Sequence, residues 1–353
     1  MDSRNYTGRD VNDAGGTGGG HDEPMGEPGP LDGWAPLDPR WLSDAPPARE
    51  YLLSMAPNDT RAGYREPVGV IPRGRVGLLV SAGGVGKSWI CILLALAVAT
   101  GRRWLDTFEP CTMGRVLLLL AEEEPAEVRR RIYQAGLLLR LTETERADAA
   151  HNIVALGLSG NRTQLVDEDG DLSEFCGDLT SHLDDGGPPW CLAILDPLSR
   201  FGGAGFEKDN AQATALVEVL ERLTAVKGHP TVITAHHTSQ SDRLRGGASA
   251  VSARGVTATV DGARFVLALE ALDPYPRVPD LVRLNFVKGN YTARIEPVDL
   301  VRDPDHEGAM RRATKNETDD YKNAEVGAKA AVKATKAAVE SQAKAQAKMT
   351  LET

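Results

Sequence analysis

A phosphate-binding motif stands out at residues 81–88, which read Ser-Ala-Gly-Gly-Val-Gly-Lys-Ser. Phosphate oxygens need backbone N–H groups that converge on them, and glycines followed by a helix N-terminus provide such groups. Lys87 can reach the β- and γ-phosphates and the Ser88 hydroxyl can bind Mg²⁺, although Ser81 stands where the usual pattern has a glycine. A glycine-rich turn without a ligand is the alternative. We predict a nucleotide site made by Gly83, Gly84, Val85, Gly86, Lys87, Ser88 and Trp89.

An acidic residue at the end of a second apolar run completes the expected magnesium site. Residues 192–196 read Leu-Ala-Ile-Leu-Asp, and Pro197 follows. Walker-type ATPases place an aspartate there to hold the metal, so Ser88 and Asp196 are the predicted Mg²⁺ ligands. An aspartate that only caps a strand end is the alternative. In many such ATPases a glutamate base follows the aspartate, but Pro197 occupies that position, so the base must come from elsewhere.

Glu122 is the candidate for this general base. It follows the expected strand 115–120 and precedes an expected helix. A carboxylate beside the phosphate loop can activate a water for attack on the γ-phosphate. The run Glu122-Glu-Glu-Pro125 also suits a helix start on its own, since acidic residues and an initial proline are favourable there. The proline at position 197 favours Glu122 as the base, with Glu123 as the second candidate.

Two histidines end another apolar run, which reads Thr-Val-Ile-Thr-Ala at residues 231–235. A polar group at the end of a strand beside the phosphate loop would contact the γ-phosphate and transmit its presence to the following loop. His237 is the predicted residue for this role. Surface or structural histidines are the alternative, and the chain order Lys87, Glu122, Asp196, His237 favours the functional interpretation.

The elements that position these residues alternate short apolar runs with amphipathic ones from residue 49 to residue 300. This alternation predicts an α/β fold with a mostly parallel, twisted sheet flanked by helices and a β-rich C-terminal part. Expected strands lie at 76–80, 116–120, 153–156, 192–195, 231–235, 265–269, 281–287 and 293–295. Expected helices lie at 89–100, 125–139 and 210–227.

The two ends differ in composition from this central domain, 49–300. Residues 1–48 are rich in glycine, proline and acidic residues, with few aliphatics to offset the entropy of ordering, which predicts a disordered arm. Residues 301–353 form an Ala/Lys-rich tail that we expect to be disordered or weakly helical. Helical spacing would align five of its lysines on one face, as a solvated helix or a nucleic-acid strip: Lys329, Lys333, Lys336, Lys344 and Lys348.

Composition limits the remaining classes. The formal charge of −10 excludes a globally basic nucleic-acid-binding protein, so any DNA contact must come from local loops. The four cysteines form no CxxC pair, which argues against a disulfide scaffold or zinc module and predicts a reducing, cytoplasmic location. The longest apolar run, 89–100, is too short to cross a membrane, and no secretion signal is recognisable.

From about residue 50 to residue 296 the chain resembles the RepA-type, RecA-like P-loop ATPases, the hexameric plasmid replicative helicases and their phage and mobile-element relatives. The matching segments occur in the family's order: GVIPRGRVGLLVSAGGVGKS, RVLLLLAEEEPAEVRRRI, LAILDPLSRF, VITAHHTS, SARG, VDGARF and NFVKGNYT. The resemblance implies that Glu122 is the catalytic carboxylate and His237 the γ-phosphate sensor. It also implies that Arg264 reaches a neighbouring subunit's site as an arginine finger, with Arg254 and Lys288 near that interface. An arginine that merely covers the domain edge is the alternative for Arg264.

In RecA-like rings the loops after two of these strands line the central channel and hold single-stranded DNA. Here they are residues 199–208, with Arg200, and residues 238–250, with Arg243 and Arg245. Arginines on glycine-rich loops suit contacts to the DNA backbone without sequence reading. Phe201 and Phe206 are the only aromatic candidates for base stacking, and surface loops without a ligand are the alternative.

These observations predict a ring-forming ATPase that binds Mg²⁺ and ATP and acts as a DNA helicase on single-stranded DNA. The expected partners are further copies in a homohexamer or similar ring and a primase or initiator protein, with no membrane. A DNA- or partner-binding switch, a loader or a defence regulator that hydrolyses ATP without unwinding remains the alternative.

Overall fold

The computed structural model describes residues 35–56, 67–167, 169–203, 205–206, 209–237, 257–292 and 294–351. The chain divides into two units, residues 1–48 and residues 49–353. In the first unit the described residues include one short helix, α1 (Arg40–Ser43), on which Trp41 and Leu42 are exposed. All the candidate site residues lie in the second unit.

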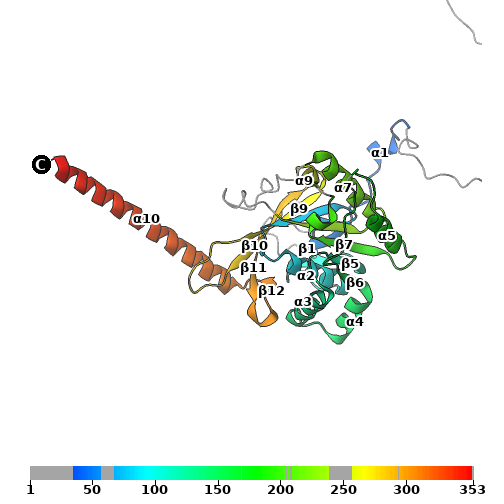
Figure 1. The fold of residues 1–353 in the computed structure, drawn as a ribbon, viewed down its shortest axis with the longest axis horizontal. Helices are drawn as coiled ribbons and strands as arrows, with labels where there is room; N and C mark the ends of the chain where they lie inside the picture. Colours follow the sequence, from blue (N-terminus) through cyan, green and yellow to red (C-terminus); the bar gives the residue numbers. More distant parts are fainter. Residues whose placement is uncertain are drawn as a thin grey trace, which may run out of the picture. The chain divides into compact units, whose positions relative to one another are not determined.

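A nine-stranded sheet forms the centre of the second unit, with strand order β12-β11-β10-β9-β3-β8-β7-β5-β6 (Figure 1). The strands from β9 to β6 in this order run parallel to their neighbours, and the pairs β9–β10, β10–β11 and β11–β12 are antiparallel. Their bounds are β3 Val76–Ser81, β5 Arg115–Leu120, β6 Ile153–Gly157, β7 Trp190–Asp196, β8 Thr231–His237, β9 Phe265–Ala271, β10 Leu281–Gly289, β11 Val298–Asp303 and β12 Ala309–Arg312. The mostly parallel α/β fold predicted from the sequence is confirmed.

Helices cover both faces of this sheet, because successive side chains of a strand point to opposite faces. On β3, Leu79 packs into a core with α2, while Leu78 and Val80 pack into a second core with α5 and α7. Strands buried on both faces read as continuous apolar runs, which is why the sequence located them well. The helix bounds are α2 Lys87–Thr100, α3 Pro125–Leu138, α4 Glu143–Asn152, α5 Glu174–Leu183, α6 Leu198–Phe201, α7 Asn210–Leu223 and α9 Thr257–Gly262.

A second, three-stranded antiparallel sheet was not expected from the sequence. Its order is β2-β1-β4, and its strands are β1 Tyr51–Met55, β2 Val68–Pro72 and β4 Phe108–Pro110. Leu52, Leu53 and Ile71 from this sheet join the core that contains α2. Helix α2 is therefore packed between the large sheet and the small one, and nearly all its side chains are buried.

The C-terminal region departs from the sequence-based expectations. The strand predicted at 293–295 is wrong for Arg294 and Ile295, which belong to no strand, and residue 293 lies outside the described residues. The boundary predicted at residue 300 falls inside β11, and the sheet continues through β12 to Arg312. Both strands are short, and β11 carries two aspartates and an arginine while β12 carries two arginines, so hydrophobic pattern alone did not mark them.

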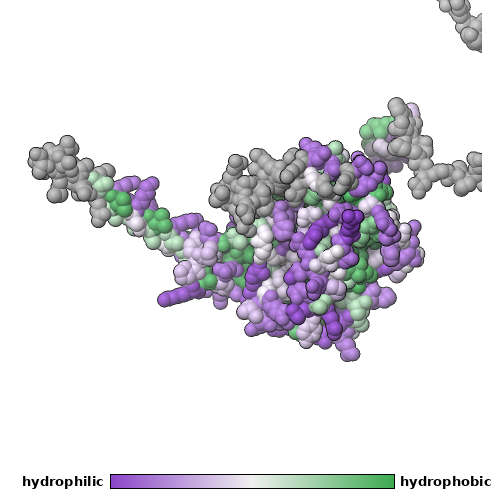
Figure 2. All heavy atoms as spheres, in the orientation of Figure 1, coloured by the Kyte–Doolittle hydropathy of each residue, from purple (hydrophilic) through white to green (hydrophobic). Residues whose placement is uncertain are grey.

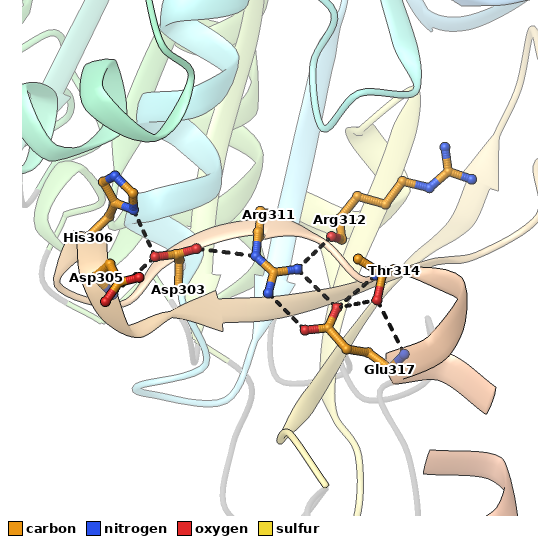
Figure 3. A network of polar contacts seen from close by, with 7 residues as sticks. All are labelled: Asp303, Asp305, His306, Arg311, Arg312, Thr314 and Glu317. Carbon is orange, nitrogen blue, oxygen red and sulfur yellow. Dashed lines mark hydrogen bonds and ion pairs between the residues drawn. The ribbon is translucent and has the colours of Figure 1, made fainter. Parts of the chain in front are cut away.

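A network of polar side chains anchors the last helix, α10 (Lys315–Leu351), to the β11–β12 hairpin (Figure 3). Arg311 on β12 donates to Asp303 on β11 and to Glu317 in the first turn of α10, at 3.2 and 2.8 Å. Thr314 and Glu317 form reciprocal capping bonds at the start of this helix. Arg311 also lowers the pKa of Glu317 to about 2. The tail expected to be disordered or weakly helical thus contains a long helix that begins at a defined cap.

The outer part of α10 exposes Val326, Val332 and Val339. Figure 2 shows hydrophobic residues at intervals along this helix. Nearer the sheet, Tyr321 is buried and its hydroxyl donates to the carbonyl of Asp273 at 3.0 Å. The start of α10 is therefore packed against the rest of the second unit.

Candidate nucleotide-binding site

Parallel strands bring the predicted catalytic residues to one edge of the sheet, because their carboxyl ends share that edge. Ser81 at the end of β3 lies opposite His237 at the end of β8. Leu120 at the end of β5 lies opposite Asp196 at the end of β7, and Glu122 follows two residues later. The sequence placed these residues on separate motifs, and the strand register brings them together.

The loop between β3 and α2 has the backbone that phosphate binding needs. Gly84 and Gly86 have φ angles of +77° and +120°, a region that side chains other than glycine rarely adopt. A Cβ atom at Gly84 would meet nothing within 4 Å, so the loop is open above this residue. Gly86 immediately precedes α2, whose N-terminal N–H groups are suited to an anion.

Lys87 is buried at the first position of α2, and its ammonium group is held by neighbours. Its Nζ donates to Ser81 Oγ at 3.0 Å and lies 3.0 Å from Nδ1 of His237. Burial lowers the pKa of Lys87, and the negative charges of Asp196 and Glu122 oppose that shift. The serine that departs from the usual motif thus has a structural role, since its hydroxyl positions the lysine.

Asp196 presents a buried carboxylate to the same loop. Burial raises the pKa of Asp196, while a hydrogen bond from the Ser88 side chain and the charges of Lys87 and His237 oppose the increase. A carboxylate next to a serine hydroxyl, below an open glycine loop, fits Mg²⁺ held jointly with nucleotide phosphates. Within the described ranges, three or more His, Cys, Asp or Glu side chains nowhere form a group suited to a metal by themselves. The phosphates would therefore have to supply part of the coordination.

The structure separates the two candidate carboxylates. Glu122 is half-exposed, and its Oε1 lies 3.8 Å from Nε of Arg200 on α6. Glu123 is less exposed, and its Oε1 lies 2.8 Å from Nη1 of Arg131 on α3. Glu123 is therefore engaged by the helix that follows it, whereas Glu122 is held loosely by an arginine of a predicted DNA-binding loop.

The two histidines at the end of β8 have different environments. His237 is exposed beside Lys87, whereas His236 is buried in the core. Burial, with the nearby charges of His237 and Lys87, lowers the pKa of His236 to about 4. Among the described residues, no hydrogen-bond partner is found for Nδ1 of His236, whose ring packs edge-on against Phe206 at 6.4 Å. His236 is thus a neutral core residue, and His237 is the one placed at the phosphate loop.

Arg264 and Lys288 lie at the opposite edge of the sheet. The N–H of Arg264 donates to the carbonyl of Val76, which begins β3, whereas the phosphate loop follows the end of that strand. The side chain of Arg264 lies 3.6 Å from Glu221. Lys288 Nζ donates to the carbonyls of Val260 and Asp261 at 2.9 and 3.0 Å, and burial lowers its pKa.

A family profile described as an AAA domain matches residues 53–243, which is more than half of the chain. The chain belongs to this AAA domain family. The matched residues include the phosphate loop, Glu122, Asp196 and His237, whereas Arg264 and Lys288 lie beyond the match.

Two solved structures are similar to this chain, and the first of them supports the fold of this AAA domain. One is described as an ATPase domain; it has a TM-score of 0.51 and 13% identity, and the match covers 69% of this chain and 86% of that one. A second is described as a DnaB-like replicative helicase and its interactions with primase; it has a TM-score of 0.49 and 13% identity, covering 66% of this chain and 56% of that one. The fold is that of a RecA-like P-loop ATPase, and such ATPases use a nucleotide, typically with Mg²⁺.

The remaining predicted site residues have different outcomes. Arg243, Arg245 and Arg254 lie outside the described residues. Trp89 is buried in the first turn of α2, where the Arg131 guanidinium lies 5.9 Å from its ring centre. Among the described helices, none has an apolar stretch long enough for a bilayer.

The expectation that Phe201 and Phe206 could stack on bases is wrong, because both are buried in the core that contains α5 and α7. Arg200 in the same segment is exposed and lies beside Glu122. Of this predicted DNA loop, the described residues therefore offer a charge but no accessible aromatic ring.

Arg302 is a neighbour of the phosphate loop that sequence reasoning missed. It lies on β11, and its Nη2 donates to the carbonyl oxygen of Gly84. Met310 on β12 also approaches the loop, since a Cβ atom at Gly86 would lie 3.3 Å from the Met310 sulfur. The residues Gly84 and Arg302 are 218 positions apart, and no motif around Arg302 indicates this contact.

Proposed function

We propose that this chain is an ATP-hydrolysing, ring-forming DNA helicase of the RepA type that acts on single-stranded DNA in the replication of a plasmid, phage or other mobile element. The observation that carries the proposal is the distribution of charged residues over two opposite edges of one sheet. Lys87 and Asp196 lie at the carboxyl edge, and Arg264 lies at the amino edge. The RecA-like fold supports the ATPase part of the proposal.

The two-edge arrangement favours a ring. Ser81 is five positions beyond Val76 on β3, which corresponds to about 16 Å along a strand, so Arg264 is remote from the phosphate loop of its own chain. Head-to-tail packing brings opposite surfaces of neighbouring subunits together, and a rotation that closes produces a ring. Arg264 would then complete a neighbour's site, where a guanidinium beside the γ-phosphate stabilises developing charge. Lys288 and Arg254 would lie near the same interface.

Each side chain at the carboxyl edge has a defined task in hydrolysis. The Lys87 ammonium breaks its hydrogen bond with the Ser81 hydroxyl and binds the β- and γ-phosphates. Ser88 and Asp196 would hold Mg²⁺. Bound Mg²⁺ supplies positive charge to the phosphate oxygens. Glu122 accepts a proton from a water whose oxygen attacks the γ-phosphorus, and the bond to the β–γ bridging oxygen breaks to leave ADP and inorganic phosphate.

Two contacts connect this site with the predicted DNA loops. His237 Nδ1 lies 3.0 Å from Lys87 Nζ, at the start of the loop 238–250, so a bound γ-phosphate would change the position of that loop. Arg200 is paired with Glu122 at 3.8 Å. A DNA phosphate that attracts Arg200 would release the carboxylate for catalysis, and Arg243 and Arg245 would add further phosphate contacts.

The decisive experiment measures strand displacement on a forked duplex beside ATP hydrolysis with and without single-stranded DNA. The proposal predicts that DNA stimulates hydrolysis and that the duplex is unwound. Stimulation without unwinding would favour a switch or loader, and no DNA binding at low salt by the assembled, ATP-bound protein would exclude a helicase. A primase or initiator protein is the expected partner, and adding one should increase unwinding.

Arg200→Ala tests how DNA is sensed. Because the pair with Glu122 is exposed and worth about 0–1 kcal/mol, its loss should raise DNA-independent hydrolysis by no more than about fivefold and reduce stimulation by DNA. Arg146→Ala, which removes an exposed arginine on α4, should change neither rate. Unaltered stimulation in Arg200→Ala would separate Arg200 from DNA sensing.

A further inference from the structure

A pocket of about 650 Å³ lies between the end of α2, the end of α3 and the β11–β12 hairpin. None of the residues assigned above to the nucleotide site is among its lining residues. Leu93, which lines it, is six residues beyond Lys87 on α2, or about 9 Å along the helix axis. Much of the lining therefore lies away from the phosphate loop, and Met310 is a lining residue that also approaches it.

Arginines outnumber acidic residues in the lining of this pocket. Two aspartates, Asp106 and Asp303, line it together with five arginines, which are Arg102, Arg103, Arg140, Arg311 and Arg312. Three of the arginines have carboxylate partners: Arg102 pairs with Glu145 at 2.7 Å, Arg103 with Glu109 at 2.9 Å, and Arg311 with Glu317 at 2.8 Å. These pairs hold part of the wall in place.

Arg140 and Arg312 differ from these three arginines in having no carboxylate partner among the described residues. Across the part of the chain that the structure describes, neither side chain has an ion pair or a hydrogen bond. Figure 3 shows the guanidinium of Arg312 pointing away from the network formed by Asp303, Arg311 and Glu317. Two arginines that lack partners, on separate elements beside one cavity, are available to an anion.

The backbone around the pocket is held in an unfavourable conformation. Leu105, Asp106 and Arg140 line it, and their φ angles are +53°, +51° and +50°. Residues other than glycine rarely adopt this region, and such residues concentrate at ligand sites and switches. At position 140 the backbone conformation would favour glycine or asparagine, so the arginine is not explained by the turn itself.

Apolar side chains complete the pocket and indicate the kind of ligand. They are Leu93, Leu105, Leu138, Leu139 and Met310. A cavity of this volume falls within the usual range of about 300–1,000 Å³ for small-molecule sites. We propose that this pocket binds a phosphorylated small molecule of nucleotide size, with its phosphates on Arg140 and Arg312 and its uncharged part on the apolar lining.

A ligand here would be connected to the phosphate loop through the hairpin. Met310 lines the pocket and its sulfur would lie 3.3 Å from a Cβ atom at Gly86. Arg302, on the same hairpin, donates to the carbonyl of Gly84. Occupation of the pocket is therefore expected to change nucleotide affinity at the phosphate loop.

The test measures binding of ADP and of inorganic pyrophosphate to the full chain by calorimetry, in a Lys87→Ala background that weakens the phosphate loop. The proposal predicts that a binding event remains. Arg140→Ala combined with Arg312→Ala should weaken it at least about tenfold, because two charge-assisted contacts are lost. Arg129→Ala is the matched control, since it removes an exposed arginine from α3 outside the pocket.

Any of three results would overturn the proposal. The first is that neither probe binds at millimolar concentration, and the second is that the double variant binds a probe as well as the Arg129→Ala control does. The third is that single-stranded DNA displaces the probe and that its own binding depends in the same way on Arg140 and Arg312. The last result would assign the surface to the DNA backbone. Because the measurement is of binding, its outcome is independent of whether the protein unwinds DNA.

Discussion

In the parallel half of the large sheet, the candidate site residues come at the carboxyl ends of strands, whereas in the antiparallel half the neighbours of the phosphate loop come from within strands of a hairpin. Ser81, Asp196 and His237 each end a parallel strand. Arg302 and Met310 lie within β11 and β12, and both approach the phosphate loop from the side.

The difference reflects how the two kinds of strand present residues. Parallel strands align their carboxyl ends at one edge, so residues that end neighbouring apolar strands lie close together. Antiparallel neighbours alternate in direction, and the position of a side chain then depends on register and on which element the hairpin contacts. A site of the first kind can be recognised from contiguous motifs, and a site of the second kind cannot.

The largest effect is expected at the parallel edge, from Lys87→Ala. Loss of the buried ammonium removes the cationic partner of the β- and γ-phosphates, and we expect ATP hydrolysis to fall about 10³-fold or more. Phosphate release measures it, with Lys322→Ala on α10 as the control. A Lys87→Ala protein with nearly unchanged turnover would contradict the assignment of the phosphate loop.

The second-largest effect is expected from Glu122→Gln, which is compared with the same change at the adjacent Glu123. Glu122→Gln should bind ATP and hydrolyse it at least about 10²-fold more slowly, which is the scale for loss of a general base. Glu123→Gln is the matched control and should remain within a few-fold of the wild-type rate, since Glu123 is paired with Arg131 at 2.8 Å. Single-turnover hydrolysis measures both variants. The reverse order would make Glu123 the base.

The third effect is a change of stability with pH, and it tests whether the His236 side chain at the parallel edge is shielded from water. Burial lowers the pKa of His236 to about 4. Below its ordinary pKa of 6.5 the unfolded chain takes up a proton that the folded chain does not, so stability should fall between pH 6.5 and 4, by up to about 1.4 kcal/mol per pH unit. Urea unfolding of the wild type and His236→Asn at pH 7 and pH 5 measures this contribution. Equal losses in the two proteins would mean that His236 is not shielded.

The smallest effect is expected at the antiparallel side. Arg302→Ala removes an exposed guanidinium from the carbonyl of Gly84, and we expect the Kd for ADP to rise about threefold, the scale of an exposed charged contact. Arg302→Lys keeps the charge and should restore part of the affinity. A loss as large as that of Lys87→Ala would mean that the hairpin is an essential part of the nucleotide site.

Hydrophobic pattern located most of the sheet, and its failures have physical causes. The central strands are continuous apolar runs because both of their faces are buried, and the sequence located them to within a few residues. The small sheet β2-β1-β4 was missed because its strands are only three to five residues long. Strand β11 was missed because an arginine and two aspartates interrupt it, and β12 because two of its four residues are arginines.

The sequence by itself determined the nucleotide loop, since Gly84, Gly86, Lys87 and Ser88 act through local backbone geometry that neighbouring residues impose. It also determined the aspartate and histidines at the ends of apolar strands. Only the tertiary structure decided that Arg200 lies beside Glu122, that Phe201 and Phe206 are buried, and that Arg302 contacts Gly84. These contacts join residues distant in sequence, and packing and strand register, rather than local residue preference, bring them together.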